Sequence, residues 1–267
     1  MSVTPKIHSR NIPLPIQREV RQRCGFGCVI CGIPLYEYEH MNEWAIVKRH
    51  VADEITLLCD KHHREKTSGL LPKQVVEKAN LDPYNLRSGV SKPYDLYFSG
   101  NKINAVIGSN LFTYLCPKNS LSVMTPISID GVPIVSVILM DNHLLLNIII
   151  FDKFNNVVFE IRDNQLFYST EPWDIQLVGT TLTIRESLGN ILIEFKFTPP
   201  NLIEITRGKL LLNGVEVKIK PKEILINNNT ISYIGNLIFD CTHFLALGPH
   251  HPNIKAMYNF NNIDRYK

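Results

Sequence analysis

The chain has 267 residues, of which 45% are hydrophobic and 20% are charged. This balance excludes an intrinsically disordered protein, and the length is enough for one large domain or two ordinary ones with buried cores. The net charge of +3 does not by itself indicate a nucleic acid partner, because a basic face can exist within a nearly neutral total.

The N-terminal segment has neither the apolar core of a signal peptide nor the length of a membrane helix. Residues 1–20 mix charges with prolines, and the most apolar run, residues 143–151, is about half as long as a membrane span. We therefore expect a cytoplasmic protein without a membrane partner. In that reducing compartment, clustered cysteines more often bind metal than form disulfides.

The first predicted elements are an arm and a short helix. Residues 1–15 are interrupted by prolines and predict an extended arm, and residues 16–23 predict a helix with basic residues on its exposed side. The stretch that follows, residues 24–67, contains four of the six cysteines and four of the nine histidines. Such a concentration indicates that the chemistry of the chain is located there.

Two pairs of metal-ligand residues lie in this stretch. Cys28 and Cys31 are separated by two residues, as are Cys59 and His62, and 27 residues separate the two pairs. Two intervening residues let both side chains of a tight turn reach one ion, and two such turns complete a tetrahedron. The spacing predicts a structural Zn²⁺ held by these four residues. Two alternatives remain: Cys24 replaces one of these ligands, or the cysteines are buried thiols that bind no metal.

A second set of polar residues lies inside this zinc frame. Glu39 and His40 follow the alternating residues 36–38, a pattern typical of a strand that presents a carboxylate and an imidazole at its end. His63 adjoins the last zinc ligand and opens a polar run that predicts a helix. The zinc site does not need these three side chains, which makes them candidates for a second, functional site.

The sequence CxxC, then an acidic residue and histidine, then LLCxxHHxxK resembles the HNH nuclease family over about residues 16–75. The resemblance implies a ββα-metal fold and a metal-dependent endonuclease that hydrolyses DNA phosphodiester bonds. It implies that His40 is the general base, and that Glu39 and His63 bind a catalytic Mg²⁺ or Mn²⁺. A neutral imidazole can accept a proton from water, and such hard cations prefer oxygen ligands. The basic residues around this set are candidate phosphate contacts: Lys48, Arg49, Lys61, Arg64 and Lys66.

One position departs from the family pattern. Where the family usually has asparagine, five residues before the third cysteine, this chain has Glu54. Glu54 is a candidate third cation ligand, with Asp53 as an equally suitable carboxylate, or it forms a surface charge pair. The departure also leaves open the alternative that this domain is a relative of the family that does not cut DNA.

After this stretch the sequence predicts a helix over residues 73–80 and then a linker over residues 82–95, which is rich in Pro, Gly, Ser and Asn. Residues 96–248 alternate short apolar runs with turn signals about every ten residues, which predicts an all-β domain. Residues 149–161 align with residues 183–195, and their acidic residues and turn asparagines coincide. This repeated hairpin unit fits a β-sandwich or a β-solenoid. Residues 249–267 predict a polar tail.

We therefore expect an α+β chain, with an HNH-like zinc domain over residues 1–81 followed by an all-β domain. The leading hypothesis is a DNA endonuclease whose β domain serves in targeting, homo-oligomerisation or the sensing of a ligand or protein trigger, with roles such as restriction, defence or mobile-element processing in bacteria or phages. The alternative is a zinc-containing binding or structural protein without activity, whose β domain recognises a protein or a glycan.

Overall fold

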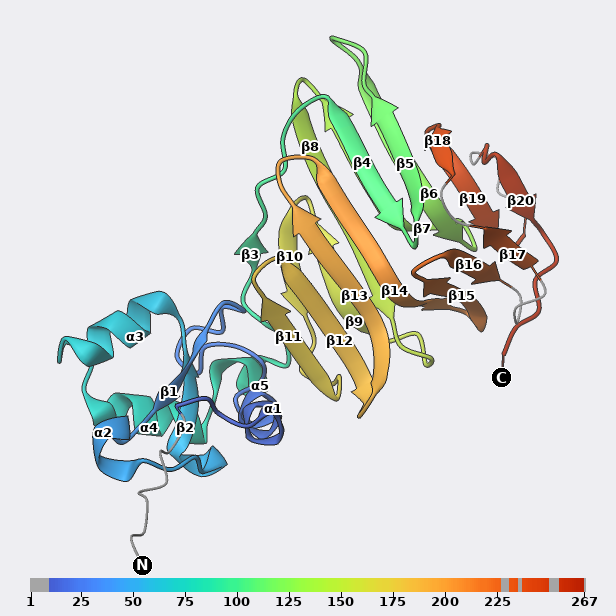
Figure 1. Ribbon diagram of the computed structural model, residues 1–267. Helices are drawn as coiled ribbons and strands as arrows, with labels where there is room; N and C mark the ends of the chain where they lie inside the picture. The colour runs from blue at the N-terminus through green and yellow to red at the C-terminus, as the bar shows by residue number, and fades with distance from the viewer. Residues whose placement is uncertain (1–9, 227–230, 235–236, 250–254, 267) are drawn as a thin grey trace, which may run out of the picture. The chain divides into compact units, whose positions relative to one another are not determined.

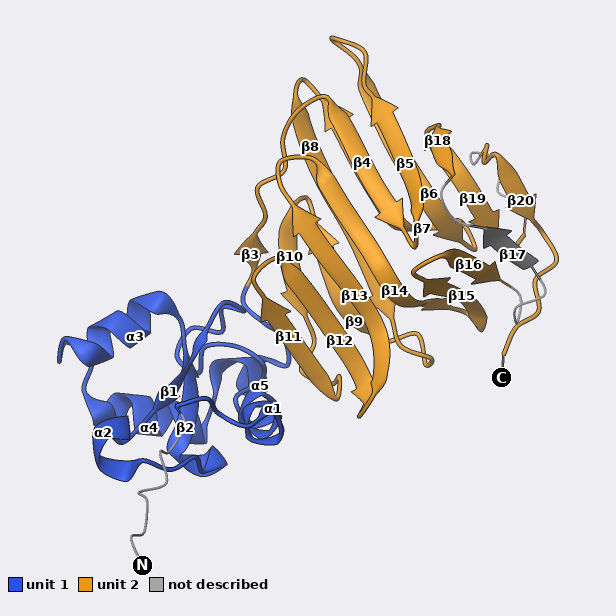
Figure 2. Cartoon of the chain, viewed as in Figure 1, with its two compact units in different colours: residues 1–92 blue, residues 93–267 orange. Residues whose placement is uncertain are grey.

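The structure is a computed structural model of the chain. It describes residues 10–226, 231–234, 237–249 and 255–266, so most of the predicted N-terminal arm lies outside the described residues. The chain divides into two compact units, residues 1–92 and residues 93–267 (Figure 2). It is mainly β, and the described helices fall within residues 14–88.

The first unit combines a two-stranded sheet with short helices (Figure 1). Strands β1 and β2 are antiparallel, with Glu37 opposite Leu58 and His40 opposite Ile55. A single residue, Cys59, separates the end of β2 from the start of helix α3. The elements in order are α1 (Leu14–Arg23), β1 (Glu37–His40), α2 (Trp44–Val47), η1 (Ala52–Glu54), β2 (Ile55–Leu58), α3 (Asp60–Thr67), α4 (Lys73–Leu81) and α5 (Tyr84–Ser88).

The core of the first unit is built around β2. All four residues of this strand are buried, and its apolar members Ile55, Leu57 and Leu58 belong to the same cluster as the fully buried Val20 of α1 and Val76 of α4. The helices predicted over residues 16–23 and 73–80 are confirmed as α1 and α4. The expected exposed basic side of α1 is wrong, because Arg21 is only 3% exposed and donates to the Tyr38 hydroxyl, and Arg23 donates to the Ala52 carbonyl. Burial of these apolar side chains stabilises helices that are too short to be stable alone.

Residues 82–92 belong to the first unit, so the predicted linker over residues 82–95 is wrong. Helix α5 carries Asn85, which is fully buried and donates a hydrogen bond from its side chain to the Gly25 carbonyl at 2.8 Å. A Cβ on Gly32 would lie 2.4 Å from the Asn85 amide oxygen, and Gly32 has φ +76°. Glycine at this turn is what allows α5 to pack so closely. The turn-rich composition therefore marks packed turns rather than a free linker.

The described residues of the second unit form two sheets, and one of them contains eight strands in the order β20-β19-β6-β7-β8-β9-β10-β3. Strands β6 to β10 form an antiparallel meander, whereas β19 is parallel to both β6 and β20. The bounds are β3 (Tyr94–Asp95), β6 (Leu121–Ile129), β7 (Val132–Met140), β8 (His143–Phe151), β9 (Val157–Arg162), β10 (Gln165–Tyr168), β19 (His243–Leu247) and β20 (Tyr258–Phe260).

The other sheet contains ten strands, with β11 to β17 in chain order. Strand β4 joins it parallel to β14, β5 pairs with β4, and β18 pairs with β5. The bounds are β4 (Lys102–Ile107), β5 (Asn110–Leu115), β11 (Asp174–Val178), β12 (Thr181–Ser187), β13 (Asn190–Thr198), β14 (Leu202–Leu212), β15 (Val215–Lys220), β16 (Glu223–Ile226), β17 (Ile231–Ile234) and β18 (Ile238–Asp240).

The two sheets of the second unit pack against each other across an apolar core. Phe159 of β9 and Phe195 of β13 are fully buried, and their rings stack with centroids 5.2 Å apart. Of the two architectures expected, this is the sandwich, because successive strands pair as antiparallel hairpins rather than stacking as parallel coils. The repeated segments form the β8–β9 and β12–β13 hairpins, one in each sheet.

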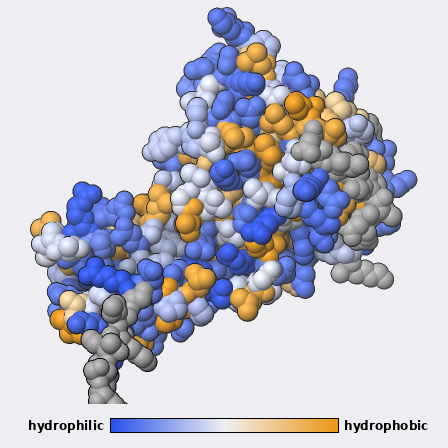
Figure 3. Space-filling view, in the orientation of Figure 1, coloured by the Kyte–Doolittle hydropathy of each residue, from blue (hydrophilic) through white to orange (hydrophobic). Residues whose placement is uncertain are grey.

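The visible face of the molecule is largely hydrophilic, with hydrophobic patches among the strands of the second unit (Figure 3). Among the described residues, no helix is both long and apolar enough to cross a membrane.

The C-terminal residues are not simply a surface tail, although residues 250–254 and 267 lie outside the described residues. Strand β20 extends the eight-stranded sheet, and Arg265 forms two contacts with the Asp130 carboxylate, at 2.7 and 2.9 Å. The same guanidinium donates to the Asn213 carbonyl at 2.7 Å. The predicted tail over residues 249–267 is thus corrected, because ladder and charge-assisted hydrogen bonds hold its described part on the sandwich.

We expect Arg265→Ala to lower the free energy of unfolding by about 1 kcal/mol at pH 7. Hydrogen bonds from Arg265 hold the pKa of Asp130 below its ordinary value of 3.8. A carboxyl with a lowered pKa stabilises the folded state above its ordinary pKa, and this contribution is lost as the pH falls through the lowered value. Urea unfolding at several pH values should therefore show the wild-type and variant stabilities converging below about pH 4. Arg162→Ala, which removes an exposed pair with Glu160, is the control and should cost less. The bond from Arg265 to the Asn213 carbonyl does not titrate, so a small difference remains at low pH; a difference that does not shrink as the pH falls would contradict this role of Asp130.

Candidate metal centre and active site

Cys28, Cys31, Cys59 and His62 converge on one point in the first unit. Their ligand atoms all lie within 4.8 Å of one another. Cys31 Sγ is 3.7 Å from Cys59 Sγ, and His62 Nδ1 is 3.3 Å from the sulfur atoms of both Cys28 and Cys59. A tetrahedral zinc ion with bonds of about 2.3 Å to sulfur holds its sulfur ligands about 3.8 Å apart. The cluster can therefore hold a structural metal such as zinc, as the spacing predicted.

The local backbone explains why these side chains meet. In the first turn, the Gly32 amide donates to the Cys28 carbonyl at 2.8 Å and the Cys28 amide donates to Ile33 at 3.0 Å. In the second, the chain passes from β2 through Cys59 into α3, where the His63 amide donates to the Cys59 carbonyl at 2.8 Å. Each turn aims two ligands at the same point, which is the geometry of a zinc knuckle.

Cys24 lies apart from this cluster, which removes it as an alternative ligand. Its sulfur is 4.0 Å from the Thr56 hydroxyl and 3.9 Å from the Asn80 amide oxygen, and burial raises the pKa of its thiol. Within the cluster, a hydrogen bond from Cys31 lowers the pKa of Cys28 to about 4, and the same contact raises the pKa of Cys31. The Cys28 thiolate is the form that binds a metal.

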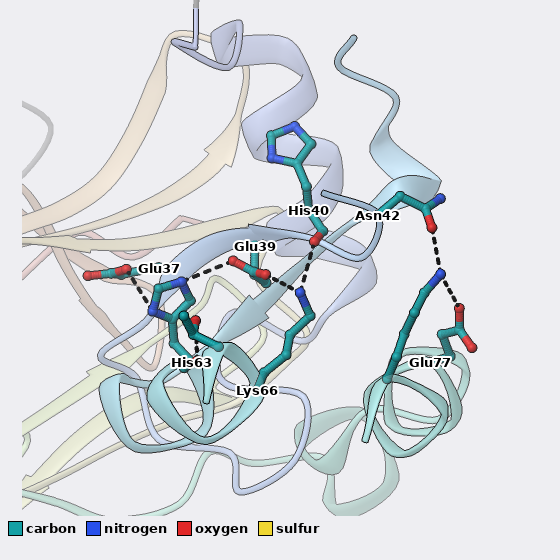
Figure 4. Close-up of polar contacts among 9 residues, drawn as sticks. Glu37, Glu39, His40, Asn42, His63, Lys66 and Glu77 are labelled. Atoms are coloured by element: carbon teal, nitrogen blue, oxygen red, sulfur yellow. Dashed lines mark hydrogen bonds and ion pairs between the residues drawn. The ribbon is translucent and has the colours of Figure 1, made fainter. Parts of the chain in front are cut away.

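A second group of polar side chains lies between β1 and α3 (Figure 4). Glu39 Oε2 is 3.0 Å from His63 Nε2, and Glu37 Oε2 is 3.6 Å from His63 Nδ1. The Lys66 ammonium forms an ion pair with Glu39 and donates to the His40 carbonyl at 3.3 Å. The Glu39 side chain is only 17% exposed, and the positive charge of Lys66 beside it offsets the cost of removing its carboxylate from water. The structure thus brings together Glu39 and His63, as predicted from the sequence, and adds Glu37.

The His40 ring lies on the other side of β1 from the Glu39 carboxylate (Figure 4). Its Nε2 is 3.2 Å from His50 Nδ1, and the Trp44 ring stacks on His50 with centroids 4.5 Å apart. Burial and the neighbouring His50 lower the pKa of His40, which favours the neutral imidazole. Successive side chains of a strand point to opposite faces, and this separates His40 from Glu39.

The sequence placed Glu54 as a third cation ligand, but in the structure its carboxylate is bound by Arg49. Arg49 Nε donates to Glu54 Oε2 at 3.1 Å, and this hydrogen bond lowers the pKa of Glu54. Of its two proposed roles, the surface charge pair is the one observed. Asp53 lies 3.9 Å from the Arg23 guanidinium and is largely exposed.

The five predicted phosphate contacts fall into two groups. Lys66 and Arg49 are paired with Glu39 and Glu54. The side chains of Lys48, Lys61 and Arg64 are exposed, with Lys61 3.9 Å from the Glu65 carboxylate, and Arg64 lines a shallow hollow of 420 Å³ together with His63. The second group is therefore better placed to meet a phosphate.

Sequence reasoning missed Glu37 as a neighbour of His63 and His50 as a neighbour of His40. Alternation along the strand places Glu37 on the same face as Glu39, and this was the available signal for it. No local pattern predicts the contact between His50 and His40, because the turn around α2 brings them together.

No family model, curated protein or solved structure matches this chain. The function must therefore be argued from the geometry of the site.

Proposed function

We propose that the first unit is an HNH-type ββα-metal endonuclease that hydrolyses DNA phosphodiester bonds. The observation that carries this proposal is the Glu39–His63 pair, 3.0 Å apart, held between β1 and α3 beside the Cys/His cluster. The order of elements, an antiparallel hairpin followed directly by a helix, supports the ββα arrangement.

The donor set fits a hard divalent cation. Glu39 and Glu37 offer carboxylate oxygens and His63 offers an imidazole nitrogen, a mixture that suits Mg²⁺ or Mn²⁺. When bound, such a cation would stabilise the negative charge that develops on the phosphodiester during hydrolysis. Lys66 holds Glu39 in place and provides a positive charge beside it.

The remaining roles belong to residues of the same unit. His40, with its lowered pKa, is the candidate general base that takes a proton from water. The exposed Lys48, Lys61 and Arg64 provide contacts to phosphates that carry no sequence information. The Cys/His cluster fixes the end of β2 against α3, so its metal has a structural role. In this proposal the second unit contributes targeting, oligomerisation or ligand sensing.

The test is cleavage of supercoiled plasmid DNA by the full chain with Mg²⁺ or Mn²⁺. We expect His63→Ala to lower the rate by at least about 100-fold, because a lost cation ligand removes several kcal/mol of charge stabilisation. Zinc content should stay the same, since His63 lies outside the cluster.

The matched control is His143→Ala, which removes an exposed histidine from the second unit and should leave cleavage unchanged. Equal cleavage by wild type and His63→Ala would contradict the proposal. A zinc-loaded wild type that cuts no DNA with either cation would favour the binding-protein alternative instead.

A further inference from the structure

The second unit contains a cavity of 580 Å³ that the proposed nuclease chemistry does not use. Its walls come from the β8–β9 turn, the β12–β13 hairpin, strands β14 and β15, and the C-terminal segment at Tyr266. Ligand pockets in proteins typically measure about 300–1,000 Å³, so the cavity has room for a small molecule.

The repeated hairpins form two of these walls in the same way. In the first, the Asn156 side chain donates to Asp152 at 3.0 Å, and in the second, the Asn190 side chain donates to Glu186 at 2.9 Å. These are the acidic residues and asparagines that coincide when the two segments are aligned. Asp152 and Glu186 both line the cavity. The internal repeat thus places two carboxylates, each fixed by its own asparagine, in the lining of one cavity.

The interior of the cavity combines aliphatic and aromatic surface. Leu192 and Leu211 line it and are only 2% and 4% exposed, so the side on which they lie is rigid sandwich core. Three aromatic side chains line it as well: Phe154, Trp173 and Tyr266. A lining that combines flat aromatic rings with aliphatic side chains suits a ligand with an apolar face.

The polar groups of the lining carry both signs of charge. Lys209 pairs with Glu186 at 3.6 Å, and Arg185 pairs with the fully buried Asp174 at 3.3 Å. Burial raises the pKa of Tyr266, and the nearby carboxylates of Glu216, Asp152 and Glu186, which share the same lining, raise it further.

Because the lining carries charges of both signs, it favours neither an anionic nor a cationic ligand. An anionic ligand such as a nucleotide would meet the carboxylates of Asp152, Glu186 and Glu216. An organic cation would meet the ammonium of Lys209 and the guanidinium of Arg185. A neutral molecule rich in hydroxyl groups donates to carboxylates and accepts from cations, and so satisfies both. We propose that this cavity binds a saccharide of one or two rings, with an aromatic ring against the sugar's C–H face and the carboxylates of Asp152, Glu186 and Glu216 accepting from its hydroxyls.

The experiment measures binding to the full chain by saturation-transfer NMR and calorimetry. The probes are maltose, cellobiose and N,N′-diacetylchitobiose, with ATP as an anionic probe and spermidine as a cationic one. We expect at least one disaccharide to bind and the two charged probes not to compete with it. Trp173→Ala and Glu216→Gln should each weaken that binding by at least about tenfold.

Tyr97→Ala is the matched control, because it removes an aromatic ring that is 77% exposed and outside the cavity lining. It should leave the affinity unchanged. Glu216→Gln keeps the size of the side chain, so it tests the site even if Trp173→Ala fails to fold. Three results would overturn the proposal: no disaccharide binds, ATP or spermidine displaces the bound sugar, or the sugar binds equally to Glu216→Gln and wild type.

Discussion

Replacing Cys59 by serine is expected to release the bound zinc and to unfold the first unit while the second unit stays folded. Cys59 lies 3.7 Å from Cys31 and 3.3 Å from His62 Nδ1, so its loss removes one corner of the tetrahedron. Structural zinc contributes about 10–16 kcal/mol of binding free energy in zinc-finger peptides, which exceeds the stability of most small domains. The apolar cluster around β2 is small, and it depends on the two knuckles to close it.

The measurements are zinc content by plasma emission spectroscopy and thermal unfolding of the full chain. Wild type should carry about one zinc per chain, and Cys59→Ser should carry little and lose one of two transitions. Cys24→Ser is the matched control: it changes a buried thiol of the same stretch that lies outside the cluster. It should keep zinc. Loss of zinc from Cys24→Ser but not from Cys59→Ser would show that the wrong cysteine has been placed at the metal.

The cluster could be predicted from the sequence because its geometry is local. Two residues between Cys28 and Cys31 fix the shape of one turn, whatever the rest of the chain does. The strands of the second unit were predictable for the same reason, since each turn signal acts on its own neighbours. The order of the strands within each sheet could not be predicted from the sequence. It depends on contacts such as that of β19 with β6, which joins residues more than 110 positions apart.

The errors around the site arise from long-range packing. The sequence around Asn85 predicts a linker, because no neighbouring residue indicates that its side chain packs beside Gly32, more than 50 residues earlier. The position of Glu54 before Cys59 predicts a cation ligand, but the turn after α2 brings Arg49 next to its carboxylate and the two side chains form a hydrogen bond. Glu39 and His40 read as one unit at a strand end, yet the pleat of β1 sends their side chains to opposite faces.

His40→Ala is expected to lower metal-dependent DNA cleavage by about 10²–10⁴-fold, the range typical of a lost general base. The prediction rests on the proposed function, in which His40 acts from the opposite side of β1 to Glu39. If the phosphodiester approaches the end of the strand, where β1 stops at His40, groups on both faces can contact it. The measurement is the cleavage rate at saturating Mn²⁺, so that cation affinity does not limit the result.

His50→Ala separates a catalytic role of His40 from a structural one. His50 contacts the His40 ring at 3.2 Å and stacks on Trp44, so its removal disturbs the same face without removing the imidazole at position 40. A general base at His40 predicts a smaller loss in His50→Ala than in His40→Ala, with zinc content and melting temperature unchanged in both. If both variants lose the same amount of cleavage activity and have a lower melting temperature, the His40–His50 pair serves in packing and not in catalysis. Cleavage retained in His40→Ala would place the base elsewhere, and the Glu39 face, where Glu37 lies 3.6 Å from His63, would be the next candidate.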